Sequence, residues 1–279
     1  MPGLILRKFK SFLFHTKRSL QFLTLTFNTF ALEISYALKR SRTIAARKTS
    51  GKNCQKLVSI IVPVPGEGIL KLSEERYYYR GLRRLLTRYL PRQTHTNFEV
   101  LVYCDGPNTA VKRLIETLGD ARIQYLELER STGLYGHPQT RQGFMRAKGE
   151  FVVRMNCDNV PYATYLELLL SGFNDATDLV YARVVFSGKA RLRYFVLFIE
   201  TEKYGIINEL GSFLLPRDTG GIVRFSNISC MNYMVRTGIA RKFAESWTDQ
   251  YEADWFFIER LLRENISYTF IDALIGKKL

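Results

Sequence analysis

The chain has 279 residues, 46% of them hydrophobic, which is enough to bury the core of one large α/β domain or two small ones. Its formal charge of +15 is unevenly spread, because residues 1–52 contain eleven lysines and arginines but a single acid, Glu33. The four cysteines have no CxxC spacing, which argues against a zinc cluster or a disulfide framework and favours a reducing compartment.

Residues 1–55 form a basic extension and linker. Charges interrupt its first apolar run, so no secretory cleavage pattern is visible. Apolar side chains then recur at helical spacing between two basic clusters, at Leu23, Phe27, Phe30, Ile34 and Leu38. This pattern favours an amphipathic helix that lies on an anionic membrane. A membrane-spanning helix, a packing or disordered arm and an organelle transit peptide remain alternatives. We expect a cytoplasmic protein, peripheral on the inner face of a membrane through residues 1–52.

From Lys56 onward, strands and helices alternate, which predicts a mostly parallel sheet with crossover helices. Two of the predicted strands are followed at their carboxyl ends by acidic residues, Asp105 and Asp158. Ligands of open α/β sheets lie outside the carboxyl ends of the strands, so these acids indicate a nucleotide and metal site. In chain order the predicted elements are a strand 57–64, a helix 73–90, a strand 98–104, a helix 109–118, a strand 122–128, a helix 140–147, a strand from 151, a helix opened by Pro161 and a strand 179–186.

Several segments between Lys56 and Ile275 together resemble inverting GT-A glycosyltransferases of the family 2 type. The resemblance is carried by segments 58–63, 85–106, 136–150, 156–159 and 251–261. It implies the GT-A fold, with a mostly parallel central sheet and helices on both faces. Within a domain of residues 56–279, it implies a nucleotide-sugar-binding half at 56–160 and an acceptor-binding half at 161–279.

The resemblance also implies roles for residues that follow the predicted strands. Asp158 matches the last acid of the family's Asp-x-Asp motif and would hold Mg²⁺ or Mn²⁺, whereas Asn156 replaces the first acid. The alternative is that Asp158 caps the helix near Pro161. Asp105 matches the acid that accepts a hydrogen bond from the nucleotide base, although an Asp-Gly-Pro-Asn turn would also use it locally.

Three further positions are candidates for binding the donor. Pro63 and Glu67 stand in the first-strand loop, where the family usually has an aromatic residue and Asn. Arg141 matches an arginine that meets the diphosphate or the donor, for which its fork of N–H donors is suited. A helix-surface ion pair is the alternative for Arg141.

The acceptor hydroxyl must lose a proton when it attacks, so the reaction needs a base. Asp254 matches the catalytic base of the family, and Glu252 is a helper or substitute. Trp255 offers a flat apolar face for a sugar ring in the acceptor site. The alternatives are that the two acids stabilise the first turn of a helix and that Trp255 belongs to the core.

We therefore predict a metal-dependent, inverting glycosyltransferase of polysaccharide or cell-envelope biosynthesis. It would transfer a sugar from a UDP-sugar, in preference to a GDP- or dTDP-sugar, to a hydroxyl of a glycan or lipid-linked acceptor. Asn156 motivates one alternative, a non-catalytic sugar-nucleotide binder. The other alternative is a basic nucleic-acid-binding protein, although nucleic acid is not the partner we expect.

Overall fold

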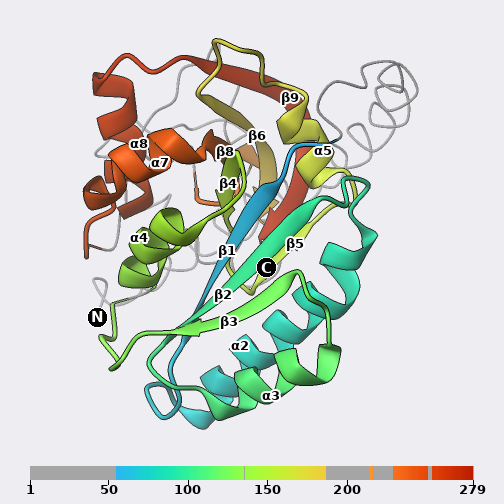
Figure 1. The fold of residues 1–279 in the computed structure, drawn as a ribbon, viewed down its shortest axis with the longest axis vertical. Coiled ribbons are helices and arrows are strands. Elements are labelled where there is room, and N and C mark those ends of the chain that lie inside the picture. Colours follow the sequence, from blue (N-terminus) through green and yellow to red (C-terminus); the bar gives the residue numbers. More distant parts are fainter. Residues whose placement is uncertain (1–54, 135, 187–213, 216–228, 251–252, 279) are drawn as a thin grey trace, which may run out of the picture.

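The structure is a computed structural model that describes residues 55–134, 136–186, 214–215, 229–250 and 253–278 (Figure 1). The predicted amphipathic segment, Glu252 and much of the acceptor-binding half lie outside these residues. Within the described part of the chain, every helix is too short or too polar to cross a membrane.

A curled sheet of nine strands runs through the molecule (Figure 1). Strands β1 to β4 pair in parallel, and β8 is antiparallel to both of its neighbours, β4 and β6. The spatial order is β3-β2-β1-β4-β8-β6-β9-β5, with β7 on β6. The strands are β1 Val58–Pro65, β2 Phe98–Asp105, β3 Ile123–Glu127, β4 Phe151–Arg154, β5 Asn159–Pro161, β6 Leu179–Phe186, β7 Leu214–Leu215, β8 Tyr233–Arg236 and β9 Tyr268–Lys278.

The strand order reverses beside β1. The chain builds β2 and β3 on one side of β1 and then returns to place β4 on the other side. The carboxyl ends of β1 and β4 therefore form a topological switch point, the usual ligand position in an open α/β sheet.

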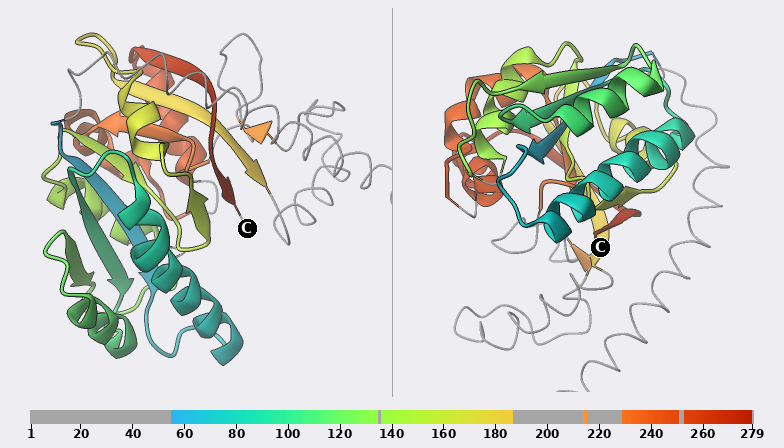
Figure 2. Two further views of the ribbon diagram at one scale, coloured as in Figure 1. Left: turned by 90° about the vertical axis from the view of Figure 1, so that its right-hand side faces the viewer. Right: turned by 90° about the horizontal axis from the view of Figure 1, so that it is seen from below.

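Helices cover both faces of the sheet, as predicted (Figures 1 and 2). One face packs against α2, α3 and α5, and the other against α4, α7 and α8. The helices are α2 Leu72–Arg84, continued by a π-helical turn Leu85–Tyr89 and a 3₁₀ turn Leu90–Arg92, then α3 Thr109–Leu118, α4 His137–Arg146, α5 Tyr165–Leu170, α7 Thr237–Lys242 and α8 Ala253–Arg263.

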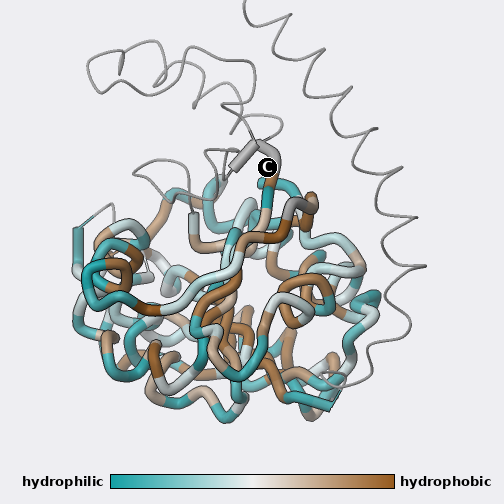
Figure 3. The backbone as a smooth tube through the Cα atoms, turned by 90° about the horizontal axis from the view of Figure 1, so that it is seen from above, coloured by the Kyte–Doolittle hydropathy of each residue, from teal (hydrophilic) through white to brown (hydrophobic). Residues whose placement is uncertain are grey.

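Side-chain alternation along the strands divides the core into two clusters. Ile60 and Val62 of β1 pack towards α2 and α3, whereas Ile61 between them packs towards α4 and α8. All three are fully buried, as expected for a strand with both faces covered. Figure 3 shows hydrophobic stretches running through the middle of the molecule.

The second half of the sheet differs from prediction. Pro161 does not open a helix; it ends β5, and α5 begins only at Tyr165. The hydrogen bonds of β5 go to β9, a strand that sequence reasoning did not predict. Helix α4 begins at His137, three residues before the predicted start, because Pro138 is well placed in a first helical turn.

Candidate functional site

Two acids lie near the switch point, one after β4 and one in the first turn of α8. Burial raises the pKa of Asp158 and of Asp254 above the ordinary aspartate value. The positive charges of Lys278 and Arg154 act in the opposite direction on the pKa of both acids. Because charge interactions weaken with distance, both acids lie within electrostatic reach of the same two cations.

Asp158 lies in a short turn between β4 and β5. The side-chain amide of Asn159 donates to its Oδ1 at 3.4 Å, and Asn159 Oδ1 accepts from the backbone N–H of Asn156 at 2.7 Å. Because α5 begins at Tyr165, Asp158 does not cap a helix near Pro161, and that alternative is excluded. Lys278 is the register partner of Asn159 in the β5–β9 pair, which explains its proximity to Asp158.

The residues around this turn fit a divalent ion that is shared with a substrate. Among the described residues, no group of three or more His, Cys, Asp or Glu side chains could hold a metal by itself. Mg²⁺ is commonly bound by one or two carboxylates together with substrate phosphates. The carboxylate of Asp158 and the amide oxygen of Asn156 match this smaller protein contribution.

Asp254 is held by backbone groups. Its Oδ1 accepts a hydrogen bond from the N–H of Trp255 at 2.9 Å, and backbone hydrogen bonding from Trp255 and Cys230 opposes the rise in its pKa. Trp255 itself is partly buried and packs against the core cluster beneath α8. The first turn of α8 therefore meets the segment before β8 at this point.

Arg154, the last residue of β4, is the functional candidate that sequence reasoning missed. Its Nη1 donates to Cys230 Sγ at 2.8 Å and its Nε donates to Thr140 Oγ1 at 3.2 Å. Its guanidinium carbon lies 5.4 Å from the ring centroid of Trp247. Burial opposes its charge, but Cys230 and Asp254 raise the pKa of Arg154. A lone arginine in an apolar strand was the available signal in the sequence.

Asp105 organises the loop that leads to α4. Its carboxylate is buried and accepts hydrogen bonds from the backbone N–H groups of Thr132 and Gly133 at 2.9 and 2.7 Å, and from the Thr132 and Ser131 hydroxyls at 2.8 and 3.3 Å. These contacts are distant in sequence, so Asp105 does more than form a local turn. Its contact with a nucleotide base stays a prediction.

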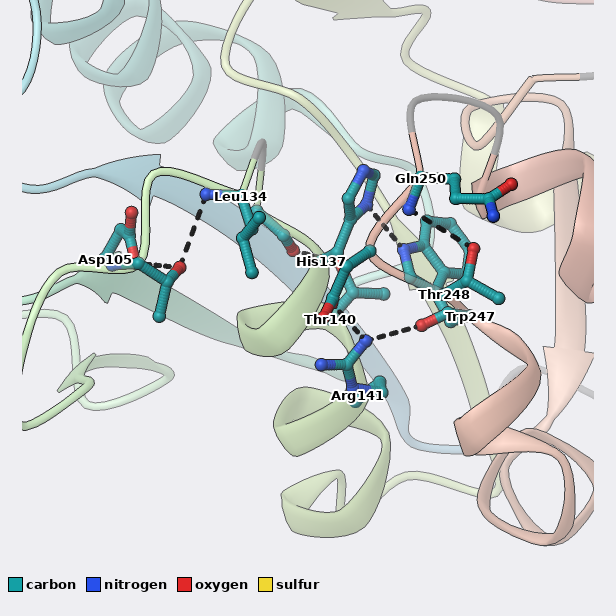
Figure 4. Close-up of polar contacts among 11 residues, drawn as sticks. Asp105, Leu134, His137, Thr140, Arg141, Trp247, Thr248 and Gln250 are labelled. Carbon is teal, nitrogen blue, oxygen red and sulfur yellow. Dashed lines mark hydrogen bonds and ion pairs between the residues drawn. The ribbon is translucent and has the colours of Figure 1, made fainter.

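Arg141 points across to the segment that follows the 3₁₀ turn Ala244–Ser246. Its Nη1 donates to the backbone oxygen of Trp247 at 2.7 Å (Figure 4). The same nitrogen donates to Asp249 Oδ1, also at 2.7 Å. An ion pair is thus present, and a contact with the donor stays a prediction. In the first-strand loop, the exposed Glu67 accepts from the N–H of Thr109 at 3.1 Å, and its donor-binding role is likewise untested.

His137 is a neutral neighbour of this site. The indole N–H of Trp247 donates to His137 Nδ1 at 3.0 Å (Figure 4). Burial lowers the pKa of His137 to about 4; Arg154 and Arg141 add to this effect and Asp249 opposes it. At neutral pH the imidazole therefore accepts from Trp247 and carries no charge.

The architecture matches GT-A transferases of known structure. The crystal structure of S. aureus TarS 1-349 has 16% identity and a TM-score of 0.55, over 79% of this chain and 59% of that chain. Mannosyltransferase PcManGT from Pyrobaculum calidifontis, in complex with GDP-Man and Mn²⁺, has 15% identity and a TM-score of 0.53, over 92% of this chain and 68% of that chain. At these identities the likeness concerns the fold.

This likeness shows that the protein has the GT-A fold. The family described as "Glycosyl transferase family 2" matches residues 59–235, which is more than half of the chain, and the chain belongs to that family. The chain spans 59% of the length of TarS 1-349, and no curated protein sequence matches it.

Proposed function

We propose that the protein is an inverting glycosyltransferase that moves a sugar from a nucleoside diphosphate sugar to a hydroxyl of a glycan or lipid-linked acceptor. One observation carries this proposal. Asp158 follows β4 and Asp254 opens α8, yet both respond to Arg154 and Lys278. Asp158, which we propose to bind the donor, and Asp254, which we propose to accept the proton, therefore share the same two neighbouring cations.

Asp254 is the proposed base. In an inverting reaction the acceptor hydroxyl attacks the anomeric carbon from the face opposite the leaving diphosphate, and its proton passes to a carboxylate oxygen of Asp254. The N–H of Trp255 holds this carboxylate in place. Burial raises the pKa of Asp254, which makes its ionised form a stronger base. The ring of Trp255 is proposed to contact the acceptor sugar, and Glu252 to assist as a second acid.

Asp158 and Asn156 would hold Mg²⁺ or Mn²⁺ together with the donor's phosphates. When bound, the ion supplies positive charge to the departing diphosphate. TarS 1-349 has been crystallised with UDP and with UDP-GlcNAc, and PcManGT with GDP-Man and Mn²⁺. These neighbours support a nucleotide-sugar donor, of which we favour a UDP-sugar.

We also propose that the enzyme works on an anionic membrane, as a step in building a cell-envelope polysaccharide. Residues 1–52 carry the basic sequence that motivates this proposal. Support from the described part of the chain comes from α2 and the turns after it, where exposed arginines form no ion pair with a described residue. These arginines are Arg76, Arg80, Arg83, Arg84, Arg88 and Arg92.

The test is a thermal-shift panel of UDP, GDP, dTDP and their common sugar conjugates, with and without Mn²⁺, followed by an assay of donor consumption. We expect one diphosphate series to stabilise the protein, by about 2.7 kcal/mol at a hundred times its Kd. Lack of stabilisation by every nucleotide would refute the proposal. Binding without donor consumption, with added glycan and lipid-linked acceptors, would indicate the non-catalytic alternative. Salt-sensitive binding to DNA or RNA in place of nucleotides would indicate the other alternative.

A further inference from the structure

Arg154 is a buried cation at the carboxyl end of β4. Only 7% of the residue is exposed, and it contacts the Thr140 hydroxyl, the Cys230 sulfur and the face of the Trp247 ring. Within the part of the chain that the structure describes, no carboxylate lies within ion-pair distance of it. Burying a charge without a close counterion is costly, so this position calls for an anion.

The guanidinium has donors left for such an anion. Arginine carries five N–H donors, and the contacts to Thr140 and Cys230 use the Nε–H and one of the two on Nη1. The remaining nitrogen, Nη2, lies beside Gly136, where a Cβ atom would come within 3.5 Å of it and within 2.7 Å of Pro63 Cβ. Gly136 also has φ +84°, a conformation that favours glycine.

Gly136 brings a second source of positive charge to the same place. It is the N-cap of α4, a helix of ten residues whose amino end carries partial positive charge. Arg154 ends β4, and Pro63 lies near the end of β1. The side chain and the helix end therefore meet at the switch point, where the ligand of an open α/β sheet is expected.

We propose that Arg154 binds the diphosphate of the donor directly, so that the diphosphate contributes to nucleotide binding even when no divalent ion is present. This inference rests on the proposed function and assigns a residue to the diphosphate part of its donor site. Its chemical basis is the planar fork of an arginine, which pairs with two phosphate oxygens at once.

The charge around Asp158 supports the same conclusion. Asn156 is a neutral amide, so Asp158 is the one carboxylate of this turn. The positive charges of Arg154 and Lys278 act on that carboxylate. One carboxylate beside two cations leaves positive charge that suits an anion such as a diphosphate.

The experiment is isothermal titration in EDTA with UDP and UMP, and with GDP and GMP, on the full chain. The wild-type protein is expected to bind one diphosphate about 10- to 100-fold more tightly than its monophosphate. R154M is expected to remove most of this difference and R154K part of it, because lysine keeps the charge without the fork. R154M should bind the monophosphate with an affinity within about twofold of wild type. The monophosphate lacks the second phosphate, so the substitution removes no charge-assisted contact from it.

R122M is the matched control, because Arg122 stands at the amino end of β3 and pairs with Asp120. It should leave both affinities unchanged. If R154M does not fold, the wild-type comparison in EDTA and R154K still test the proposal. Equal binding of diphosphate and monophosphate, diphosphate binding that needs Mn²⁺, or variants that bind like wild type would each overturn it and leave the proposed function standing. If no nucleotide binds with or without Mn²⁺, the proposed function fails as well.

Discussion

The two faces of the central sheet are built from different kinds of residue. The face under α2, α3 and α5 is a continuous cluster of mainly aliphatic side chains. The face under α4, α7 and α8 is rich in aromatic rings and borders buried polar groups, including His137 and Arg154. On that second face the Tyr233 hydroxyl and the Gln139 amide are buried with no hydrogen-bond partner among the described residues.

One strand shows how this division arises. Along β4, Val153 faces the aliphatic cluster, whereas Val152 faces the aromatic cluster and Arg154 stacks on Trp247 of that cluster. Alternation along a strand places neighbours on opposite faces. The comparison teaches that the aliphatic face mainly supplies stability, whereas the aromatic face carries the cost of burying the polar groups around Arg154 and His137. Four experiments, in order of decreasing expected effect, would break or sharpen this division.

The largest effect is expected at Asp254, on the polar face. Removing a general base lowers kcat by about 10²- to 10⁴-fold, so D254N should abolish most transfer while nucleotide affinity stays within about twofold. Initial rates and nucleotide titrations measure the two quantities. An equal loss of nucleotide binding would contradict the role of a base, because the acceptor hydroxyl and not the nucleotide meets this carboxylate.

On the aliphatic face, L82A should destabilise the fold without changing the chemistry. Leu82 is fully buried, and truncating a buried leucine costs about 2–5 kcal/mol. L72A is the matched control on the same helix, since Leu72 is 63% exposed and should change stability by less than about 0.5 kcal/mol. Denaturant unfolding and kcat, measured at a temperature where L82A is folded, test both expectations. A large change in kcat would break the division between the faces.

His137 makes the polar face sensitive to acid. The pKa of His137 is about 4 in the folded protein, against an ordinary value of 6.5. As the pH falls, the imidazole therefore takes up a proton in the unfolded chain before it does so in the folded protein. Its contribution to stability is therefore complete above pH 6.5 and is lost as pH falls towards 4, by up to about 3 kcal/mol. H137Q keeps an oxygen to accept from Trp247 and should flatten the melting-temperature curve between these values. A curve parallel to that of wild type would show that another group titrates.

The smallest effect on stability is expected at the ion pair of Arg141 with Asp249. The two side chains are 22% and 49% exposed, so R141M and D249N should each cost less than about 1 kcal/mol. Donor affinity separates the two roles of Arg141. If it meets the donor, as predicted, R141M weakens donor binding and D249N does not. Equal donor affinities would leave Arg141 as a link between α4 and the segment before α8.

The sequence alone determined several helices and strands of the fold. Helix α3 and strand β6 have the predicted bounds, because a short periodic segment between clear turn signals is specified locally. It also determined the family and drew attention to Asp158 and Asp254, since motif order is a property of the chain itself.

Only the tertiary structure decided which groups surround those acids. The charge of Arg154 reaches Asp254 because β4 and the segment before β8 are neighbours in space. The charge of Lys278 reaches Asp158 because β9 pairs with β5. Both juxtapositions depend on strand order, which joins residues more than seventy positions apart. Local periodicity fixes the face on which a side chain lies, but not the distant segment that packs against that face.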